Sequence, residues 1–198
     1  MIATETRTRF EDARRAMIDS QLRTSGVNEP FVLARMGAVP REDFVPEGQR
    51  AAAYSDRAVR LPGGGVLPAP LFHGLLLAEA RPASSDHALV VDGGSGYLPA
   101  LLEPLVGALV VVSPEDAVAG RIKSCPSLVL IDGAVEHLPE KLVRKLGDGT
   151  RIVTGLVERG VTRLAIGRKT GGVLGLVALA ETGAPRLAAF DREAGWSF

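Results

Sequence analysis

The chain has 198 residues, 46% of them hydrophobic and 23% charged, which is typical of a globular protein with one substantial core. Its 23 basic residues equal its 23 acidic residues in number, so nucleic acid and anionic membranes are not expected as partners. A single cysteine, Cys125, excludes an internal disulfide, and the lack of a signal-like N-terminal segment predicts a cytoplasmic protein.

The first part of the chain has a helical pattern. Apolar residues recur at helical spacing from Phe10 to Leu22, and Gly26 is expected to end this helix. Asn28 is expected to cap a second helix that has Pro30 in its first turn. A further helical pattern follows at residues 71–80, so we expect residues 1–85 to form a helical, substrate-side segment packed on the domain that follows.

From residue 86 onward, apolar strands alternate with helical patterns, which predicts an α/β fold with a mostly parallel sheet over residues 86–198. The expected strands are 88–91, 108–112, 127–131 and 151–156, and the expected helices are 98–106, 116–123 and 139–146. Two final strands at 162–168 and 173–180 flank Lys169-Thr-Gly-Gly172 and predict a C-terminal antiparallel hairpin.

A glycine-rich loop follows the first of these strands. Gly93, Gly94 and Gly96 would let the backbone turn tightly and approach a ligand, as in the nucleotide sites of doubly wound domains. Asp92 adds a carboxylate at the start of the loop, and the loop could instead be a tight turn that Asp92 caps without any ligand. A nicotinamide cofactor is disfavoured because Pro99 stands where its fingerprint requires a glycine or alanine.

Several motifs together resemble one family, the protein-L-isoaspartate O-methyltransferases. They are Met17-Ile-Asp-Ser-Gln-Leu-Arg23, Val32-Leu-Ala-Arg-Met-Gly-Ala-Val-Pro-Arg-Glu-Asp-Phe-Val-Pro46, Ala53-Tyr-Ser-Asp56, Ser95-Gly-Tyr97 and Leu130-Ile-Asp-Gly-Ala134. The resemblance implies a Rossmann-like class I methyltransferase, a three-layer sandwich. It also implies methyl transfer from S-adenosylmethionine to isoaspartyl or D-aspartyl carboxylates of peptides and proteins, in protein repair.

The resemblance also implies a cofactor site. Its residues would be Asp92, Gly93, Gly94, Ser95, Gly96, Tyr97, Glu115 and Asp132. The family pattern Gly-x-Gly-x-Gly-Tyr has its first glycine replaced by Asp92, beside the expected methionyl part of the cofactor. Glu115 would accept hydrogen bonds from the ribose, or else only favour the dipole of a helix in whose first turn it lies. Asp132 would touch cofactor or substrate, or else only end its strand.

On the substrate side, the family segment Gln-Thr-Ile-Ser-x-Pro corresponds to Gly65-Val-Leu-Pro-Ala-Pro70. Leu67, Pro68 and Pro70 are the implied substrate-side residues, and the hydroxyl of the family serine is lost. His73 is expected to be a packed histidine rather than a general base, because methylating a carboxylate removes no proton. Neither a catalytic residue nor a metal ligand is identified.

The chain also looks like a shortened, divergent member. Only the 35 residues 97 to 131 separate the glycine loop from the strand that reaches Asp132, so one edge strand with its neighbouring segments is expected to be missing. The alternative function is that of a non-catalytic protein of this fold, which binds a protein partner or another copy of itself. An open crevice beside Gly94 would favour the enzyme, and a crevice filled by side chains the alternative.

Overall fold

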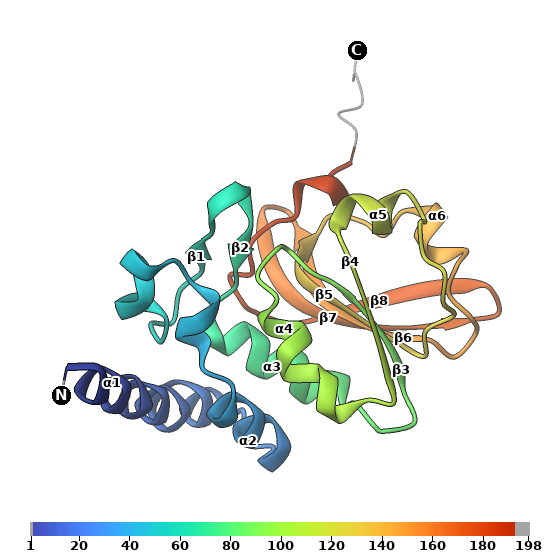
Figure 1. Cartoon of the computed structure of the whole chain (residues 1–198). Coiled ribbons are helices and arrows are strands. Elements are labelled where there is room, and N and C mark those ends of the chain that lie inside the picture. The colour runs from blue at the N-terminus through green and yellow to red at the C-terminus, as the bar shows by residue number, and fades with distance from the viewer. Residues whose placement is uncertain (1, 193–198) are drawn as a thin grey trace.

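A computed structural model describes residues 2–192 of the chain. Its α-helices are α1 (Ile2–Met17), α2 (Pro30–Ala38), α3 (Pro70–Ala80), α4 (Tyr97–Leu102), α5 (Pro114–Val118) and α6 (Glu140–Val143) (Figure 1). Its strands are β1 (Val59–Arg60), β2 (Val66–Leu67), β3 (His87–Val91), β4 (Ala108–Val112), β5 (Leu128–Val135), β6 (Arg151–Glu158), β7 (Val161–Thr170) and β8 (Val173–Glu181).

The central sheet has six strands in the order β4-β3-β5-β6-β7-β8. The pairs β4-β3, β3-β5 and β5-β6 are parallel, whereas β7 runs antiparallel to both β6 and β8. This is the expected α/β architecture, and the C-terminal antiparallel hairpin is confirmed. Because β4, β3, β5 and β6 are parallel, their carboxyl ends meet at one edge, where ligands bind in folds of this class.

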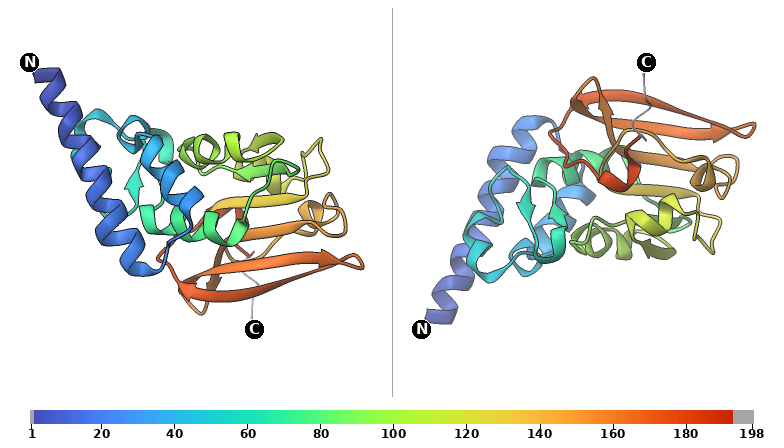
Figure 2. Two further views of the ribbon diagram at one scale, coloured as in Figure 1. Left: turned by 90° about the horizontal axis from the view of Figure 1, so that it is seen from below. Right: turned by 90° about the horizontal axis from the view of Figure 1, so that it is seen from above.

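Helices cover both faces of the sheet and give three layers (Figures 1 and 2). Residues alternate along each strand, so Val90 and Leu130 pack with helices α1 to α4 while Leu89 and Val129 pack with α5 and α6. A segment after β8 completes the second layer with the buried Phe190. Within residues 2–192, no helix is both long and apolar enough to span a membrane.

The N-terminal helices agree with the sequence pattern except at one cap. After α1 the chain continues as a π-helix (Ile18–Leu22) and a 3₁₀-helix (Arg23–Ser25), and it ends at Gly26 in the left-handed region, with φ of 91°, as expected. The expected cap by Asn28 is wrong. Glu29 occupies the N-cap of α2 without a side-chain hydrogen bond, since Pro30 at the first helical position removes one N–H that would need a cap.

In the second half, the helices are shorter than expected, and every strand except β4 is longer at one or both ends. Helix α5 begins at Pro114 rather than 116, because the Ser113 hydroxyl accepts a hydrogen bond of 3.1 Å from the Asp116 N–H and so caps it. The chain then turns at Gly120, whose φ of 69° ends the helix well before 123. Strand β5 continues past Asp132 to Val135, so Asp132 lies within the strand and not at its end.

One end of the sheet is left uncovered at β4. Among the described residues no strand lies beyond it, as the short spacing between the glycine loop and β5 predicts. Val110 and Val111 of this edge strand are 37% and 47% exposed. The missing unit therefore leaves the rest of the sheet intact but exposes apolar side chains at its edge.

The centre of the sheet is irregular next to β5. Its register with β6 shifts between Leu130 and Ala134, and the segment after β8 bonds to β5 at this point. Ala134 donates to Pro185 O at 2.7 Å, and Leu187 donates to Ala134 O at 2.8 Å. The C-terminal segment thus runs beside the carboxyl end of β5, where it forms one wall of the site described next.

Candidate functional site

A crevice of about 440 Å³ opens at the carboxyl ends of β3 and β4. Its volume lies within the range of about 300–1,000 Å³ that small-molecule sites occupy. Four segments far apart in the sequence line this glycine-loop crevice: residues 62–66, 92–94, 113–115 and 185–189. The crevice beside Gly94 is therefore open and is not filled by Tyr97, which is buried elsewhere.

The walls of the crevice approach one another through backbone atoms. A Cβ atom on Gly65 would come within 2.7 Å of the Gly93 carbonyl oxygen, closer than real Cβ atoms come to any neighbour. Gly94 has φ of 99°, a conformation that side chains disfavour. Gly65 is therefore the residue that lets the loop at 62–66 approach the glycine loop after β3, whereas a Cβ at Gly63 or Gly64 would meet nothing within 4 Å.

Asp92 folds back onto its own loop. Its carboxylate accepts hydrogen bonds from Gly96 N–H at 3.1 and 3.2 Å, close to the N-terminus of α4. Burial, and then repulsion by the Asp132 carboxylate, raise the pKa of Asp92 above its usual value. Amide groups that could hold a phosphate are therefore occupied by an internal carboxylate, and the crevice presents negative charge instead.

Glu115 lies in the first turn of α5 and also lines the crevice. Its position therefore agrees with both expectations, that Glu115 accepts hydrogen bonds from a ribose and that it favours the dipole of the helix. The Ser113 cap fixes the start of the helix and with it the place of Glu115. On the opposite wall, Arg186 is paired with Glu136 at 2.8 Å and with Asp191 at 2.5 Å, so its charge does not neutralise Asp92 and Glu115.

Beneath the crevice lies a buried charged cluster of Arg41, His73 and Asp132, all with 0% exposure. Arg41 Nη1 lies 3.2 Å from His73 Nδ1, and His73 Nε2 lies 2.8 Å from Asp132 Oδ1. Because arginine can only donate, Nδ1 must accept and the histidine proton must lie on Nε2, where it is donated to Asp132. His73 is therefore packed and fully bonded, as expected, and is not poised as a base.

Arg41 is held by backbone as well. Its Nε donates to Ala53 O at 2.7 Å, and its Nη2 donates to Pro68 O. Its guanidinium also lies 4.9 Å from the centre of the Tyr97 ring. Burial raises the pKa of Tyr97 to about 12, so its phenol stays neutral beneath the cation.

Ser95 connects the cluster to the glycine loop. Its hydroxyl lies 3.2 Å from Asp132 Oδ2 and 3.4 Å from Asp92 Oδ1, and it accepts from Tyr97 N–H at 3.2 Å. With a single proton, it can donate to only one of the two carboxylates at a time. The two carboxylates are thus coupled through one hydroxyl, which agrees with the raised pKa of Asp92.

The structure divides the residues expected to bind cofactor. Asp92, Gly93, Gly94 and Glu115 line the crevice together. Ser95 and Gly96 lie within the loop and shape it from behind. Tyr97 and Asp132 are completely buried and do not line the crevice, because the Tyr97 ring packs against Arg41 and the Asp132 carboxylate is bonded to His73.

The expected substrate-side residues also lie away from the crevice. Leu67, Pro68 and Pro70 are buried, and none of them lines the crevice. Residues 62–66, just before them, line it instead, because the β1-β2 hairpin carries this loop over Gly93. The Pro62-Gly-Gly-Gly65 run is conspicuous in the sequence, but there it indicates only a break between helices and strands and not part of a ligand site. Nothing in the sequence singled out residues 185–189.

The chain matches the family model described as "Protein-L-isoaspartate(D-aspartate) O-methyltransferase (PCMT)" over residues 12–120, which is more than half of its length. A protein-L-isoaspartate O-methyltransferase from Roseiflexus sp. (strain RS-1) is 38% identical over 142 residues, which cover 72% of this chain and 61% of that protein. This chain thus spans less than two thirds of that relative. A protein-L-isoaspartate O-methyltransferase from Koribacter versatilis is 28% identical, and the match covers 88% of this chain and 90% of that protein.

A solved structure has the same fold. It is that of a Plasmodium falciparum protein assigned as a protein-L-isoaspartate O-methyltransferase, in complex with S-adenosyl-L-homocysteine. It is 16% identical with a TM-score of 0.70 and covers 91% of this chain and 98% of its own. At this identity the likeness concerns the fold, and the sequence match over residues 12–120 decides the family. The chain therefore belongs to the protein-L-isoaspartate(D-aspartate) O-methyltransferase family.

Proposed function

We propose that this protein is an S-adenosylmethionine-dependent methyltransferase that methylates the carboxylates of isoaspartyl and D-aspartyl residues in peptides and proteins. Family membership supports the reaction class. The observation that carries the proposal is the open glycine-loop crevice at the carboxyl edge of the sheet. The non-catalytic alternative is not favoured. A protein that binds no cofactor has no need of this crevice, yet the crevice is open here.

The residues of the crevice fit this cofactor. S-adenosylmethionine, when bound, supplies an electrophilic methyl group on a positively charged sulfur. We assign its binding to Asp92, Gly93, Gly94 and Glu115, which line the crevice with backbone and two carboxylates. A cationic ligand suits a loop whose amide groups are already bonded to Asp92, whereas a phosphate would meet negative charge there.

The chain's own residues contribute placement more than chemistry. In the proposed reaction a substrate carboxylate oxygen bonds to the methyl carbon as the carbon–sulfur bond breaks, and no proton is transferred. Catalysis then depends on aligning two reactants and excluding water. The loop at 62–66, held against Gly93, is the wall that would hold the substrate over the crevice. This role replaces the one expected for Leu67, Pro68 and Pro70.

The proposal extends to partners and location. A protein carboxylate is the expected substrate, and we place the activity in the cytoplasm, which a chain with one cysteine and no membrane-spanning helix in residues 2–192 permits. We also propose that the protein associates with a second copy of itself. The exposed edge strand β4 is where a second copy would bind, and analytical ultracentrifugation across a concentration series tests it.

The test has two stages. Calorimetric titration of the full chain with S-adenosylmethionine and S-adenosylhomocysteine is expected to show binding of both. Methyl transfer from labelled cofactor is then measured on an isoaspartyl peptide and on the same peptide with ordinary aspartate, and only the former is expected to become labelled. Absence of binding at millimolar cofactor would overturn the proposal in favour of the non-catalytic alternative. Labelling of other carboxylates alone would overturn only the substrate.

A further inference from the structure

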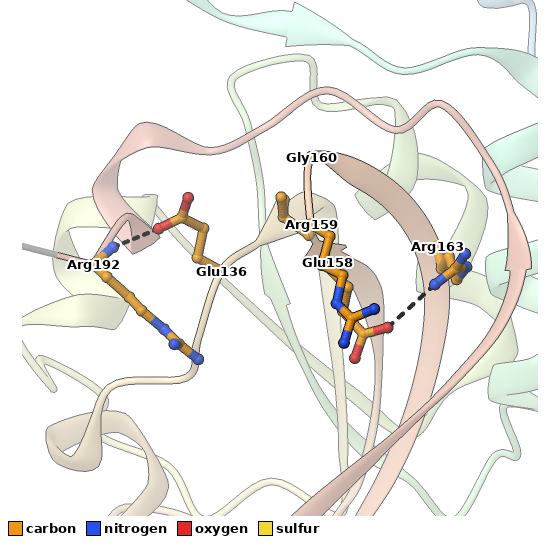
Figure 3. Close-up of a pocket in the computed structure, with 7 residues that line it drawn as sticks. Glu136, Glu158, Arg159, Gly160, Arg163 and Arg192 are labelled. Carbon is orange, nitrogen blue, oxygen red and sulfur yellow. Dashed lines mark hydrogen bonds and ion pairs between the residues drawn. The ribbon is translucent and has the colours of Figure 1, made fainter.

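We propose that a second pocket beside the crevice binds an acidic side chain of the protein substrate. This inference rests on the proposed function and names a preference in its substrates. The pocket lies at the same carboxyl edge of the sheet, and it is lined by Glu136, Val157, Glu158, Arg159, Gly160, Arg163 and Arg192 (Figure 3). We refer to it as the arginine pocket.

The arginine pocket and the glycine-loop crevice share a wall. Arg186 lines the crevice, Glu136 lines the arginine pocket, and the two side chains form an ion pair of 2.8 Å. A polypeptide whose reacting carboxylate enters the crevice can therefore pass along this edge and present a neighbouring side chain to the pocket. In Figure 3, Arg159 and Arg163 lie with Glu158 on one side of the view, and Arg192 lies with Glu136 on the other.

Two of the three guanidinium groups are available to a ligand. Arg163 is bonded to Glu158 at 3.4 Å and to Glu181 at 3.2 Å. The side chains of Arg159 and Arg192 have no hydrogen bond or ion pair with any other residue in the described range 2–192. Both are exposed, so they can turn toward an incoming carboxylate at little cost.

Arg159 occupies a position that its backbone conformation does not favour. It forms the β6-β7 turn with Gly160, and their φ values are 51° and 81°. A two-residue turn with both φ values positive normally has asparagine, aspartate or glycine first, because a larger side chain is strained in the left-handed region. What distinguishes Arg159 from Arg81, which also has a positive φ, is that Arg159 lines a pocket.

The charge balance favours a single carboxylate over a polyanion. Three arginines and two glutamates line the pocket, so its net charge is only +1. Glu136 and Glu158 would repel a phosphate backbone or a run of acids, and the whole chain has no net charge to attract one. One glutamate or aspartate near the methylated residue matches two free guanidinium groups.

Arg159→Gly is the matched variant for the test. Glycine suits the left-handed position, so the turn and the fold are expected to persist while the guanidinium is lost. Arg81→Gly is its control, because Arg81 is the other described non-glycine residue with positive φ, at 43°, and it does not line the arginine pocket. Both variants remove one positive charge and replace an arginine by glycine at a left-handed position.

Two isoaspartyl peptides that differ only in having one glutamate or one glutamine beside the isoaspartyl residue provide the comparison. For the unaltered protein we expect a lower KM for the glutamate peptide. Arg159→Gly is expected to raise that KM about fivefold. The KM of the glutamine peptide serves as the internal reference, and Arg81→Gly is expected to leave the preference as it is. An equal KM for both peptides, or a preference that survives Arg159→Gly, would overturn the inference.

Fluorescence anisotropy separates this inference from the proposed function. The same two peptides, labelled with a dye and added without cofactor, report binding alone. Binding of the glutamate peptide that Arg159→Gly weakens, together with no methylation of any peptide, would overturn the proposed function and support the pocket. Methylation of both peptides, with no difference in their binding, would support the proposed function and overturn the pocket. Binding of inorganic phosphate in preference to the glutamate peptide would overturn the assigned ligand.

Discussion

The glycine-loop crevice and the buried charged cluster lie next to each other but have opposite designs. The crevice is open, is lined by backbone and by carboxylates, and is held together by close approach of glycines. The cluster of Arg41, His73 and Asp132 is closed to solvent, and each charged group in it has bonded partners. A ligand site and the buried groups that support it can therefore use adjacent residues of the same motifs, so a charged motif residue is not by itself a ligand contact.

Arg41→Met should disrupt the buried charged cluster and lower the free energy of unfolding more than any other variant considered. It leaves the Asp132–His73 pair without its cation and strands the carbonyls of Ala53 and Pro68, so we expect a loss of about 3–5 kcal/mol in the free energy of unfolding. Urea unfolding followed by circular dichroism measures it. Arg50→Met makes the same chemical change at an exposed residue and should cost little. A loss below about 1 kcal/mol for Arg41→Met would contradict the assigned role of the cluster.

Gly65→Ala should disturb the open region through a single methyl group. The new Cβ would lie 2.7 Å from Gly93 O, and the loop would have to move away from the crevice. We expect a loss of about 1–3 kcal/mol in stability and weaker binding of S-adenosylmethionine in calorimetry. Gly48→Ala is the control, because a Cβ at Gly48 meets nothing within 4 Å. Unchanged binding by Gly65→Ala would show that the close approach does not shape the site.

Ser113→Ala tests whether the cap of α5 positions Glu115. Loss of the hydrogen bond to Asp116 N–H should cost about 1 kcal/mol of stability. It should also weaken cofactor binding, because Glu115 sits in the first turn of that helix. Ser84→Ala is the comparison, since the exposed Ser84 side chain makes no hydrogen bond with other residues of the range 2–192. Loss of stability with full cofactor affinity would remove Glu115 from the site.

Asp92→Asn should have the smallest effect on stability, and in the opposite direction. The pKa of Asp92 is raised in the folded protein by burial and by the Asp132 carboxylate. The folded state therefore binds this proton more tightly than the unfolded state, and the Asp92 carboxylate lowers stability as pH rises above its ordinary pKa of 3.8. We expect Asp92→Asn to be more stable than the unaltered protein near neutral pH, with the difference shrinking toward acid pH in urea titrations.

Asp92→Asn should also change the affinity of the crevice for charged ligands. If the Asp92 carboxylate favours a positively charged ligand, Asp92→Asn should bind S-adenosylmethionine about fivefold more weakly and the uncharged S-adenosylhomocysteine almost as before. Calorimetry with both compounds provides the two affinities. Tighter binding of S-adenosylmethionine would mean instead that the carboxylate obstructs the crevice.

Local patterns predicted the fold well. The continuous apolar run from Ala88 to Val91 predicted the parallel strand, and the Lys169-Thr-Gly-Gly172 turn predicted the antiparallel hairpin, because strand burial and turn chemistry are read from neighbouring residues. The caps were less predictable. Pro30 displaced the capping role expected of Asn28, and Ser113 started α5 early, since a cap depends on the geometry of a few atoms rather than on a pattern.

The candidate site was predictable only in part. The strand and glycine loop placed Asp92, Gly93 and Gly94 at the carboxyl edge, and the end of the next strand placed Glu115 beside them. The burial of Tyr97 and Asp132 was not predictable, because it depends on partners up to 59 residues away, as between His73 and Asp132. Spacing along the chain indicates which edge of the sheet a residue reaches, but not whether a distant side chain meets it there.

The family, the layered α/β fold, the antiparallel hairpin and, within residues 2–192, the absence of a strand beyond β4 could all be inferred from the sequence, because each depends on short-range pattern or on the spacing of motifs. Three features could be seen only in the three-dimensional structure: the crevice is open, Arg41, His73 and Asp132 are buried beneath it, and the loops at 62–66 and 185–189 form two of its walls. A cavity is the space left when segments distant in sequence pack against one another, and its charge is what remains after buried groups have found their partners.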